Sequence, residues 1–419
     1  MTMNREQLKF ILTSVSGNVI EWYDFALYGY FATIIAKLFF PAKDEFYSLL
    51  MTLGVFASGF VVRPLGGIIF GHIGDKHGRR LALVASIALI MFPTGLIGFL
   101  PTYSVIGICA PLLLVLLRLL QGIAVSGELT GSGIFLIECA PKQKKGFYGS
   151  LVMCSTYVGL LIGAGISVLI SYAFTDDQII RFAWRIPFII SILFGVAALI
   201  LRLQCEESPA FIQMCIEKKI LKLPVYTALK NHLVTILSVC MVSSVLAVAI
   251  YLLIGYFPSY FVSTKQMTLQ QSMAISFLGL LVLTICVPLM GKIADSVGHK
   301  MMLGLGAIGY LFFSYFIFNL AAKGSFFSCG LSVILTAILL SPIAASLLLT
   351  ISEIFPANIR YSSVSLGYNI SMTAFGGTTP LIMMSMSKNM GSEIAPSIYL
   401  GMCGFLTIAT LIFLNYKNK

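Results

Sequence analysis

The sequence predicts an all-α membrane protein with twelve transmembrane helices in two pseudo-symmetric six-helix bundles. Three observations support this prediction. The 419 residues are 58% hydrophobic and only 10% charged, and their mean hydropathy is +0.96, which lies outside the range of soluble domains. Apolar segments long enough to cross a bilayer recur along the whole chain. Two polar motifs of the first half also return in the second half.

Each predicted span contains roughly 20 or more mainly apolar residues, the length that a bilayer requires. The spans cover residues 10–38, 46–72, 81–99, 104–137, 147–173, 182–203, 230–261, 269–292, 301–321, 326–352, 361–387 and 394–416. Cytoplasmic N- and C-termini place most of the 27 Lys and Arg residues, Arg202 included, on the cytoplasmic side, as the positive-inside rule requires. Only Arg63 and Arg118 then remain within helices. In the fifth span, Gly159 and Gly163 form a GxxxG pattern, which predicts close helix packing.

Two motifs define an internal repeat. GHIGDKHGRR at 71–80 and GKIADSVGHK at 291–300 share Gly, Ile, Asp and Gly at the same offsets. ECAPKQKK and EIFPANIR, which begin at Glu138 and Glu353, share a Glu, a Pro and a base. The repeats predict an N-terminal bundle at 1–203, a cytoplasmic linker at 204–229 and a C-terminal bundle at 230–419.

The repeated loops are candidate gates. Their glycines permit tight turns, and an Asp there can cap a helix N-terminus or pair with an Arg of a neighbouring helix. Glu138 and Glu353 are expected to form ion pairs with Arg79, Arg80 or Arg360. The alternative is an ordinary loop determined by turn residues. The gating residues are therefore predicted to be Gly71, Asp75, Gly78, Arg79, Arg80, Gly291, Asp295, Gly298, Glu138, Glu353 and Arg360.

Charged residues inside the predicted helices point to function. Glu21 and Asp24 lie one turn apart in the first helix, within GNVIEWYDFALYGYF, and Arg118 and Glu128 lie in the fourth. A charge at the bilayer centre is unfavourable by at least about 2.5 kcal/mol, so these groups must face the protein interior or water. Three acids against Arg63 and Arg118 leave one negative charge unpaired. Asp24, Glu21 and Glu128 are therefore the predicted proton-coupling residues, with Asp24 preferred because of its depth.

Helical spacing places the predicted ligands on shared faces. Glu21, Asp24 and Tyr28 form one stripe, and Arg118, Gln121 and Glu128 form another, while Trp22 and Tyr23 are expected to pack elsewhere. Tyrosine rings of the second half can hold an ammonium group while Arg118 takes a carboxylate, which suits a zwitterion. Packing remains the alternative role for the tyrosines, and structural ion pairs for the arginines. The predicted substrate-binding residues are Arg118, Tyr28, Gln121, Tyr251, Tyr256, Asn369 and Arg63.

Several motifs carry a family resemblance. GGIIFGHIGDKHGRR, with GKIADSVGHK, resembles the signature loop of the major facilitator superfamily. GNVIEWYDFALYGYF, RPLGG, RLLQGIAVSGELTG, WRIPF, EESPAF and IRYS resemble its metabolite:proton symporter group. GELTGSGIFLIECAPKQKKGFYGS, YFPSYF and FPANIRYSSVSLGYNIS are most similar to the bacterial proline/glycine-betaine symporters.

This resemblance implies a monomeric, proton-coupled symporter of the bacterial inner membrane that imports a small zwitterion, such as proline or glycine betaine, by alternating access. The open alternatives are a proton symporter of a di- or tricarboxylate, such as 2-oxoglutarate or citrate, and a transporter-like nutrient sensor. No enzyme activity, cofactor, metal or nucleic-acid partner is expected, because the chain has no HExxH motif, no Walker loop and no CxxC pair. The expected partners are the substrate, the proton and the lipid bilayer.

Overall fold

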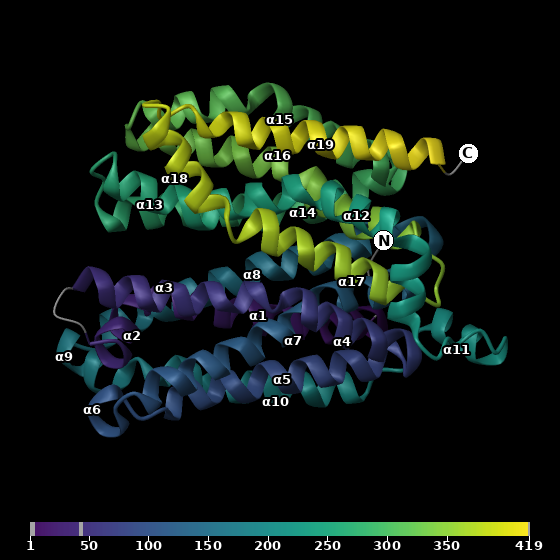
Figure 1. The fold of residues 1–419 in the computed structure, drawn as a ribbon, viewed down its shortest axis with the longest axis horizontal. Coiled ribbons are helices and arrows are strands. Elements are labelled where there is room, and N and C mark those ends of the chain that lie inside the picture. Colours follow the sequence, from purple (N-terminus) through teal and green to yellow (C-terminus); the bar gives the residue numbers. More distant parts are fainter. Residues whose placement is uncertain (1–4, 42–44, 418–419) are drawn as a thin grey trace.

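The computed structural model describes residues 5–41 and 45–417, and the regular elements of these residues are all helical. Most helices run along the long axis of the molecule (Figure 1). The first half contains α1 (Arg5–Tyr30), α2 (Ala32–Phe39), α3 (Glu45–Val61), α4 (Arg63–Lys76), α5 (Arg79–Phe99), α6 (Tyr103–Ile106), α7 (Cys109–Cys139), η1 (Lys142–Lys144), α8 (Lys145–Ala173), α9 (Asp176–Gln178), η2 (Ile179–Ala183) and α10 (Arg185–Leu203). The remainder contains α11 (Pro209–Ile216), α12 (Pro224–Tyr251), η3 (Leu252–Tyr256), α13 (Phe257–Ser263), α14 (Leu269–Val297), α15 (His299–Ala322), α16 (Phe326–Glu353), α17 (Arg360–Ser371), η4 (Met372–Gly376), α18 (Thr379–Asn389) and α19 (Pro396–Lys417).

The predicted spans are recovered as helices. Within the described residues, nine helical segments are long and apolar enough to cross a membrane. The three other predicted spans, 10–38, 46–72 and 361–387, correspond to the interrupted pairs α1–α2, α3–α4 and α17–α18. Proline explains two of the interruptions, since Pro64 and Pro380 stand in the first turns of α4 and α18 and have no N–H to continue the preceding helix.

The two halves form two layers. In Figure 1, α1 to α10 (purple through blue to blue-green) lie in one layer, and α12 to α19 (teal through green to yellow) lie in the other. Across the layers, α4 packs against α17 and α14 packs against α8. Both α4 and α14 carry the repeated glycine motif, so these contacts follow the predicted pseudo-symmetry. Whether 1–203 and 230–419 move as separate bodies stays a prediction.

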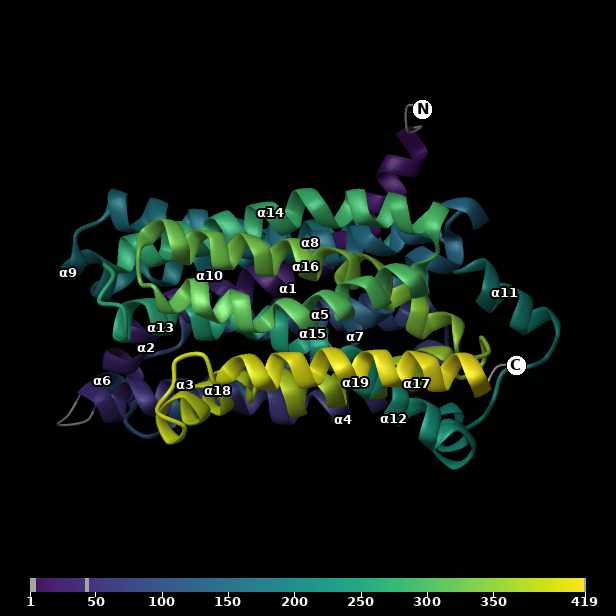
Figure 2. The same cartoon turned by 90° about the horizontal axis from the view of Figure 1, so that it is seen from above.

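The two ends of the molecule differ. At one end, here called the linker end, lie α11 and both chain termini, whereas α6, α9, α13 and α18 lie toward the opposite end (Figures 1 and 2). Residues 204–223 contain α11, and α12 has a non-helical residue at His232. The predicted linker therefore includes one short helix.

The packing of α8 on α1 orients the first helix. A Cβ atom on Gly159 would lie 2.4 Å from the carbonyl oxygen of Val19, and one on Gly163 would lie 2.6 Å from Cβ of Ala26. The two backbones can approach this closely only because both residues are glycine, so the predicted close-packing face is confirmed. This contact leaves the face of α1 that carries Asp24 turned toward α7.

Candidate functional site

A small central pocket lies between α1, the α3–α4 junction and α7. Its volume is about 40 Å³, enough for a few water molecules. Substrate of the predicted size therefore requires a wider pocket than this conformation has. The lining residues are Glu21, Trp22, Asp24, Phe25, Gly59, Phe60, Arg63, Arg118, Gln121, Gly122 and Val125.

A buried acid–base pair forms one wall of the pocket. Arg118 Nη1 lies 3.6 Å from Asp24 Oδ2, and each side chain is only 6% exposed. One turn further along α7, Gln121 Nε2 donates to Asp24 Oδ2 at 2.6 Å and to Thr94 Oγ1 at 2.7 Å. The guanidinium carbon of Arg118 lies 3.6 Å from the centre of the Tyr28 ring, a cation–π contact. The two predicted stripes thus face each other, and Thr94 of α5 is a partner that sequence spacing did not reveal.

Glu21 and Arg63 lie on the same pocket without a direct ion pair. Both side chains line the pocket, but no N···O distance between them is within 4.0 Å. Arg63 Cζ is 4.7 Å from the centre of the Phe60 ring. Oε2 of Glu21 is buried and accepts no hydrogen bond from the described part of the chain. The pocket therefore contains one paired carboxylate and one carboxylate that lacks a close cation.

Aromatic rings form the remaining wall. The ring centres of Trp22 and Phe25 are 5.2 Å apart, and those of Phe25 and Phe60 are 6.1 Å apart. From the second half, Tyr251 brings its ring within 5.4 Å of Phe60 and 6.4 Å of Phe25. Trp22 was expected to pack away from the pocket, and that expectation is wrong, because Trp22 lines the pocket. Tyr23 does pack away, and its hydroxyl donates to the carbonyl of Pro187.

Glu128 does not line the central pocket. Its Oε1 lies 2.7 Å from Arg202 Nη2, and both side chains are fully buried. Ser132 donates to Oε1 at 2.9 Å, and Ser86 donates to Oε2. Arg202 was counted among the cytoplasmic bases and not among the charges within helices, and that prediction is wrong. It lies in the last turn of α10, is fully buried, and also donates to the carbonyl of Ser14. Arg202 balances the negative charge that the sequence left unpaired.

The other predicted ligands of the second half lie apart from the pocket. Asn369 of α17 donates to the carbonyl of Ser126 at 3.0 Å and to that of Ser365 at 2.8 Å, which joins α17 to α7. Tyr256 lies toward the opposite end, where its hydroxyl is 3.3 Å from Ser387 Oγ. Of the predicted ligands in the second half, only Tyr251 reaches the aromatic wall.

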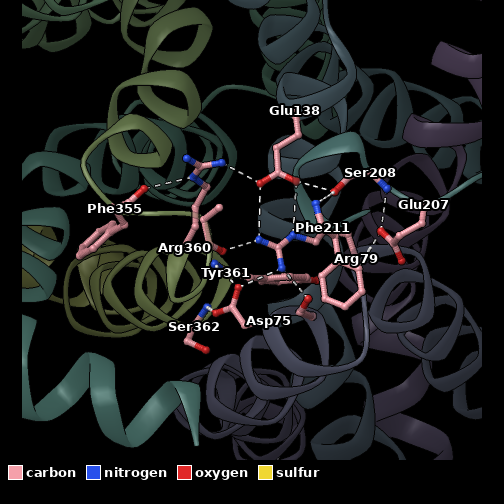
Figure 3. Close-up of polar contacts among 12 residues, drawn as sticks. Asp75, Arg79, Glu138, Glu207, Ser208, Phe211, Phe355, Arg360, Tyr361 and Ser362 are labelled. Atoms are coloured by element: carbon pink, nitrogen blue, oxygen red, sulfur yellow. Dashed lines mark hydrogen bonds and ion pairs between the residues drawn. The ribbon is translucent and has the colours of Figure 1, made fainter. Parts of the chain in front are cut away.

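A network of ion pairs closes the linker end of the first half (Figure 3). Glu138 lies 2.7 Å from Arg360 Nη1 and 3.3 Å from Arg79 Nε, and it accepts a hydrogen bond from Ser208. Arg79 Nη2 also donates to the carbonyl of Ala357 at 2.6 Å. Arg360 and Ala357 belong to the second half, so these contacts join the two bundles. The predicted pairs of Glu138 with Arg79 and Arg360 are confirmed.

Arg80 does not pair with Glu138. Its side chain donates to the carbonyl of Leu203, and its backbone N–H donates to Glu207 at 3.1 Å. Glu207 also accepts from the backbone N–H of Arg79 at 3.0 Å. The carboxylate of Glu207 thus caps the N-terminus of α5, where the helix dipole favours an anion. The side chain of Arg80 is directed to the carbonyl of Leu203 and therefore does not contact Glu138.

Asp75 connects α4 to the N-terminus of α17. It accepts from the backbone N–H groups of Tyr361 at 3.1 Å and Ser362 at 2.8 Å, and it lies 3.2 Å from Arg79 Nη1. The close approach depends on Gly71, since a Cβ there would lie 2.6 Å from Cα of Ser362. The predicted capping role of this Asp is confirmed.

The second copy of the motif makes the reciprocal contact. Asp295 of α14 accepts from the backbone N–H groups of Gly146 at 2.6 Å and Phe147 at 3.0 Å, at the N-terminus of α8. Gly291 permits this approach, and Gly298 ends α14 with a φ of 102°. Glu353 lies 3.7 Å from Lys145 and 3.3 Å from His299, not beside Arg360. Each half therefore caps a helix of the other half.

Comparison with known proteins agrees with this architecture. The family model described as "Sugar (and other) transporter" matches residues 9–222. The chain is 32% identical over 421 residues to the "Glycine betaine/proline/ectoine/pipecolic acid transporter OusA" of Dickeya dadantii, covering 97% of this chain and 83% of the relative. It is 31% identical over 425 residues to the "Proline/betaine transporter" of Escherichia coli K12, covering 97% and 83%.

A solved structure has the same fold. The proton:xylose symporter XylE of the major facilitator superfamily, bound to 6-bromo-6-deoxy-D-glucose, superposes with a TM-score of 0.80 over 97% of this chain and 94% of that chain, at 17% identity. The twelve-helix, two-bundle fold is thereby confirmed, and the nearly full-length relatives define the branch. The chain belongs to the major facilitator superfamily, among the relatives of the bacterial proline/betaine transporters.

Proposed function

We propose that this chain is a proton-coupled symporter that imports a small zwitterion, such as proline or glycine betaine, by alternating access. One observation carries the proposal: a buried Asp24–Arg118 pair shares a pocket with the rings of Trp22, Phe25 and Phe60. Arg118 can bind a carboxylate, and aromatic faces attract an ammonium group. The printed names of both relatives include proline and betaine, which supports the same substrate class.

Asp24 is the proposed proton acceptor. A proton on Asp24 removes its charge, weakens the pair with Arg118 and leaves the guanidinium to the carboxylate of the substrate. Proton and substrate then load together, which is the requirement for symport. Glu21 is the proposed partner of Asp24. Glu128 lies nearer the linker end and is the proposed next acceptor when the proton leaves Asp24 toward that end. Gln121 and Tyr28 hold Asp24 and Arg118 in position.

The gates follow from the contacts at the linker end. We assign this end and both termini to the cytoplasm of a bacterial cell, so that the closed networks around Glu138 and Asp295 seal the cytoplasmic side. Transport requires these networks to open while the opposite end closes, as 1–203 and 230–419 rock about the central site, connected by 204–229. Tyr256 and Asn369 would reach the substrate in another conformation of this cycle. The monomer is the proposed transporting unit.

A liposome assay tests the proposal. The purified protein is reconstituted, a pH gradient is imposed, and uptake of labelled proline, glycine betaine, 2-oxoglutarate, citrate and shikimate is measured. We expect saturable uptake of proline or glycine betaine that stops when a protonophore is added. If uptake of these zwitterions were unchanged by the protonophore, proton coupling would be contradicted. If neither proline nor glycine betaine were taken up, the proposed substrate class would be contradicted.

A di- or tricarboxylate is the second candidate substrate. Arg63 lines the same pocket as Arg118, is 5% exposed and has no carboxylate within 4.0 Å among the described residues. Two guanidinium groups on one pocket could bind two carboxylates. Uptake of 2-oxoglutarate or citrate alone in the same liposomes would favour this candidate.

A further inference from the structure

A second pocket lies at the opposite end of the second half, between α13 and α18. Its volume is about 280 Å³, several times that of the central pocket. Its lining combines apolar surface from rings and methylene groups with a few polar and charged groups. The lining residues are Tyr256, Tyr260, Ser263, Thr264, Met384, Ser387, Lys388 and Glu393.

The contacts inside this pocket show that it can hold an ammonium group. Lys265 Nζ donates to Glu393 Oε2 and lies 5.6 Å from the centre of the Tyr260 ring. The Tyr260 hydroxyl donates to the same oxygen at 3.0 Å, and the ring stacks on Tyr256 at 5.5 Å. A carboxylate beside an aromatic pair already binds one alkylammonium, the side chain of Lys265. The same groups suit the cation of a small ligand.

Two charged side chains of the pocket, Glu393 and Lys388, have groups that a ligand can still bind. Both hydrogen bonds to Glu393 end on Oε2, and Oε1 accepts no hydrogen bond from the described part of the chain. Glu393 is 39% exposed, so a ligand can reach it. On the facing helix α18, Lys388 is exposed and forms no ion pair with the described residues. The pocket thus has one acid and one base that a ligand can reach.

This pocket also lies next to the aromatic wall of the central site. Tyr256 follows Tyr251 by five residues in the same continuous helical segment, which corresponds to roughly 7 Å along the axis. Tyr251 contacts Phe60 of the central pocket, whereas Tyr256 lines the outer one. Residues of one helical segment therefore contact the wall of the central pocket and line the outer pocket.

We propose that this pocket is a second, outer binding site for the zwitterionic substrate, filled before the central site. The ammonium of the ligand binds Glu393 and the Tyr260 ring, and its carboxylate binds Lys388. The inference rests on the proposed import of a zwitterion, because it takes α13 and α18 to face the outside. It assigns to Tyr256 a role in the outer site. It also gives a function to a pocket of about 280 Å³, which is large enough for the substrate while the central pocket of about 40 Å³ is not.

Uptake kinetics and binding test the outer site together. Glu393→Gln, Lys388→Gln and the control Asp177→Asn, an exposed carboxylate at the same end, are reconstituted in liposomes with an imposed pH gradient. We expect a roughly threefold or larger rise in KM for labelled proline or glycine betaine in both pocket variants, with maximal rate unchanged. Since Lys388 makes no ion pair, Lys388→Gln keeps the test valid if Glu393→Gln folds poorly.

Equilibrium binding separates the two sites. In detergent, Arg118→Ala removes the central carboxylate ligand, and we expect the remaining weak binding of labelled proline or glycine betaine to disappear in Arg118→Ala/Glu393→Gln. Wild-type protein without zwitterion uptake would overturn the proposed function and the outer site with it. Normal uptake, with pocket variants that match Asp177→Asn in KM and with no binding to Arg118→Ala, would overturn the outer site alone.

Discussion

The two halves share one helical plan but differ in what they bury. Among the residues whose burial is described, every buried charged side chain belongs to the first half, whereas the second half buries tyrosine, serine, threonine and asparagine. The charged residues that are buried as a whole are Glu21, Asp24, Arg63, Asp75, Arg79, Arg118, Glu128 and Arg202, and the side chain of Glu138 is buried as well. Buried charge is unfavourable and is retained only when paired or functional. The difference teaches that the first bundle holds the buried charge on which the proposed proton coupling depends, while the second supplies rings, hydroxyls and shape.

The linker end repeats this contrast on a smaller scale. Asp75 and Asp295 cap helices of the opposite half with the same geometry. The ion pairs around them differ, because Glu138 is 2% exposed beside Arg79, whereas Glu353 is 40% exposed beside Lys145. The caps are symmetric and the salt bridges are not. Variants that are matched between the halves can therefore separate fold from mechanism.

Asp24→Asn is expected to have the largest effect. The amide keeps the hydrogen bond with Gln121 but cannot exchange a proton and cannot pair with Arg118 as an ion. Loss of one charge from a buried pair corresponds to about 3 kcal/mol, so proton-driven accumulation should fall by roughly 100-fold or more. Initial uptake of labelled proline or glycine betaine under a pH gradient measures this. Counterflow exchange should be less affected, since it needs no net proton movement.

The second-half control for this prediction is Asn369→Asp, which places a carboxylate in the neutral bundle. If coupling is confined to the first half, Asn369→Asp/Asp24→Asn does not recover accumulation. Accumulation that returned in the double variant would break the comparison between the halves.

Arg202→Met is expected to have the next largest effect, on stability. It leaves Glu128 buried without its cation, which is destabilising by about 3–5 kcal/mol. The change should appear as a lower midpoint of thermal unfolding in detergent. Arg202→Met/Glu128→Gln removes both charges and should recover most of the loss. A double variant as unstable as the single one would show that the ion pair itself, not the orphaned carboxylate, matters.

Some of the contacts behind these predictions could be predicted from the sequence, and others could not. Helical spacing placed Asp24 and Tyr28 on one face and Arg118 and Gln121 on another, and the structure brings these faces together. Repetition revealed the capping loops, because a shared Gly and Asp at matched offsets implies a shared contact. Spacing within one helix could not reveal the Arg202–Glu128 pair, which joins α10 to α7 across 74 residues.

Helix irregularities explain other misses. Tyr251 and Tyr256 were expected to share one site, but the π-helical turn η3, just before Pro258, separates them. Tyr251 contacts the rings of Phe25 and Phe60 beside the central pocket, whereas Tyr256 lines the other pocket. Trp22 lines the pocket, and a Cβ atom on Gly159 of α8 would lie 3.0 Å from its Cβ, so the position of Trp22 is tied to the packing of α8 on α1. Both effects come from tertiary packing, which hydrophobic periodicity does not encode.

Asp75→Asn and Asp295→Asn probe the symmetric caps. Each removes a charge that accepts two backbone N–H groups, and such charge-assisted bonds contribute about 1.5–3 kcal/mol. Amide hydrogen exchange should therefore rise roughly tenfold at Tyr361 and Ser362 in the first variant, and at Gly146 and Phe147 in the second. The first variant should show the larger change, because Asp75 also pairs with the buried Arg79. Equal changes would mean that Arg79 adds nothing to the first cap.

Glu353→Gln is expected to have the smallest effect on stability. Glu138→Gln, the matching change in the first half, is the variant to compare with it. Glu353 meets Lys145 at 3.7 Å in a pair that is exposed on both sides, so solvent screens it and its contribution is at most about 1 kcal/mol. Glu138→Gln leaves Arg79 and Arg360 without their shared anion in a buried position, and the loss should reach about 3 kcal/mol. Thermal unfolding of the two variants at low and high salt measures both values. If Glu353→Gln destabilised the protein as much as Glu138→Gln, the linker end would be closed by both halves equally, and the asymmetry of buried charge would lose its mechanistic meaning there.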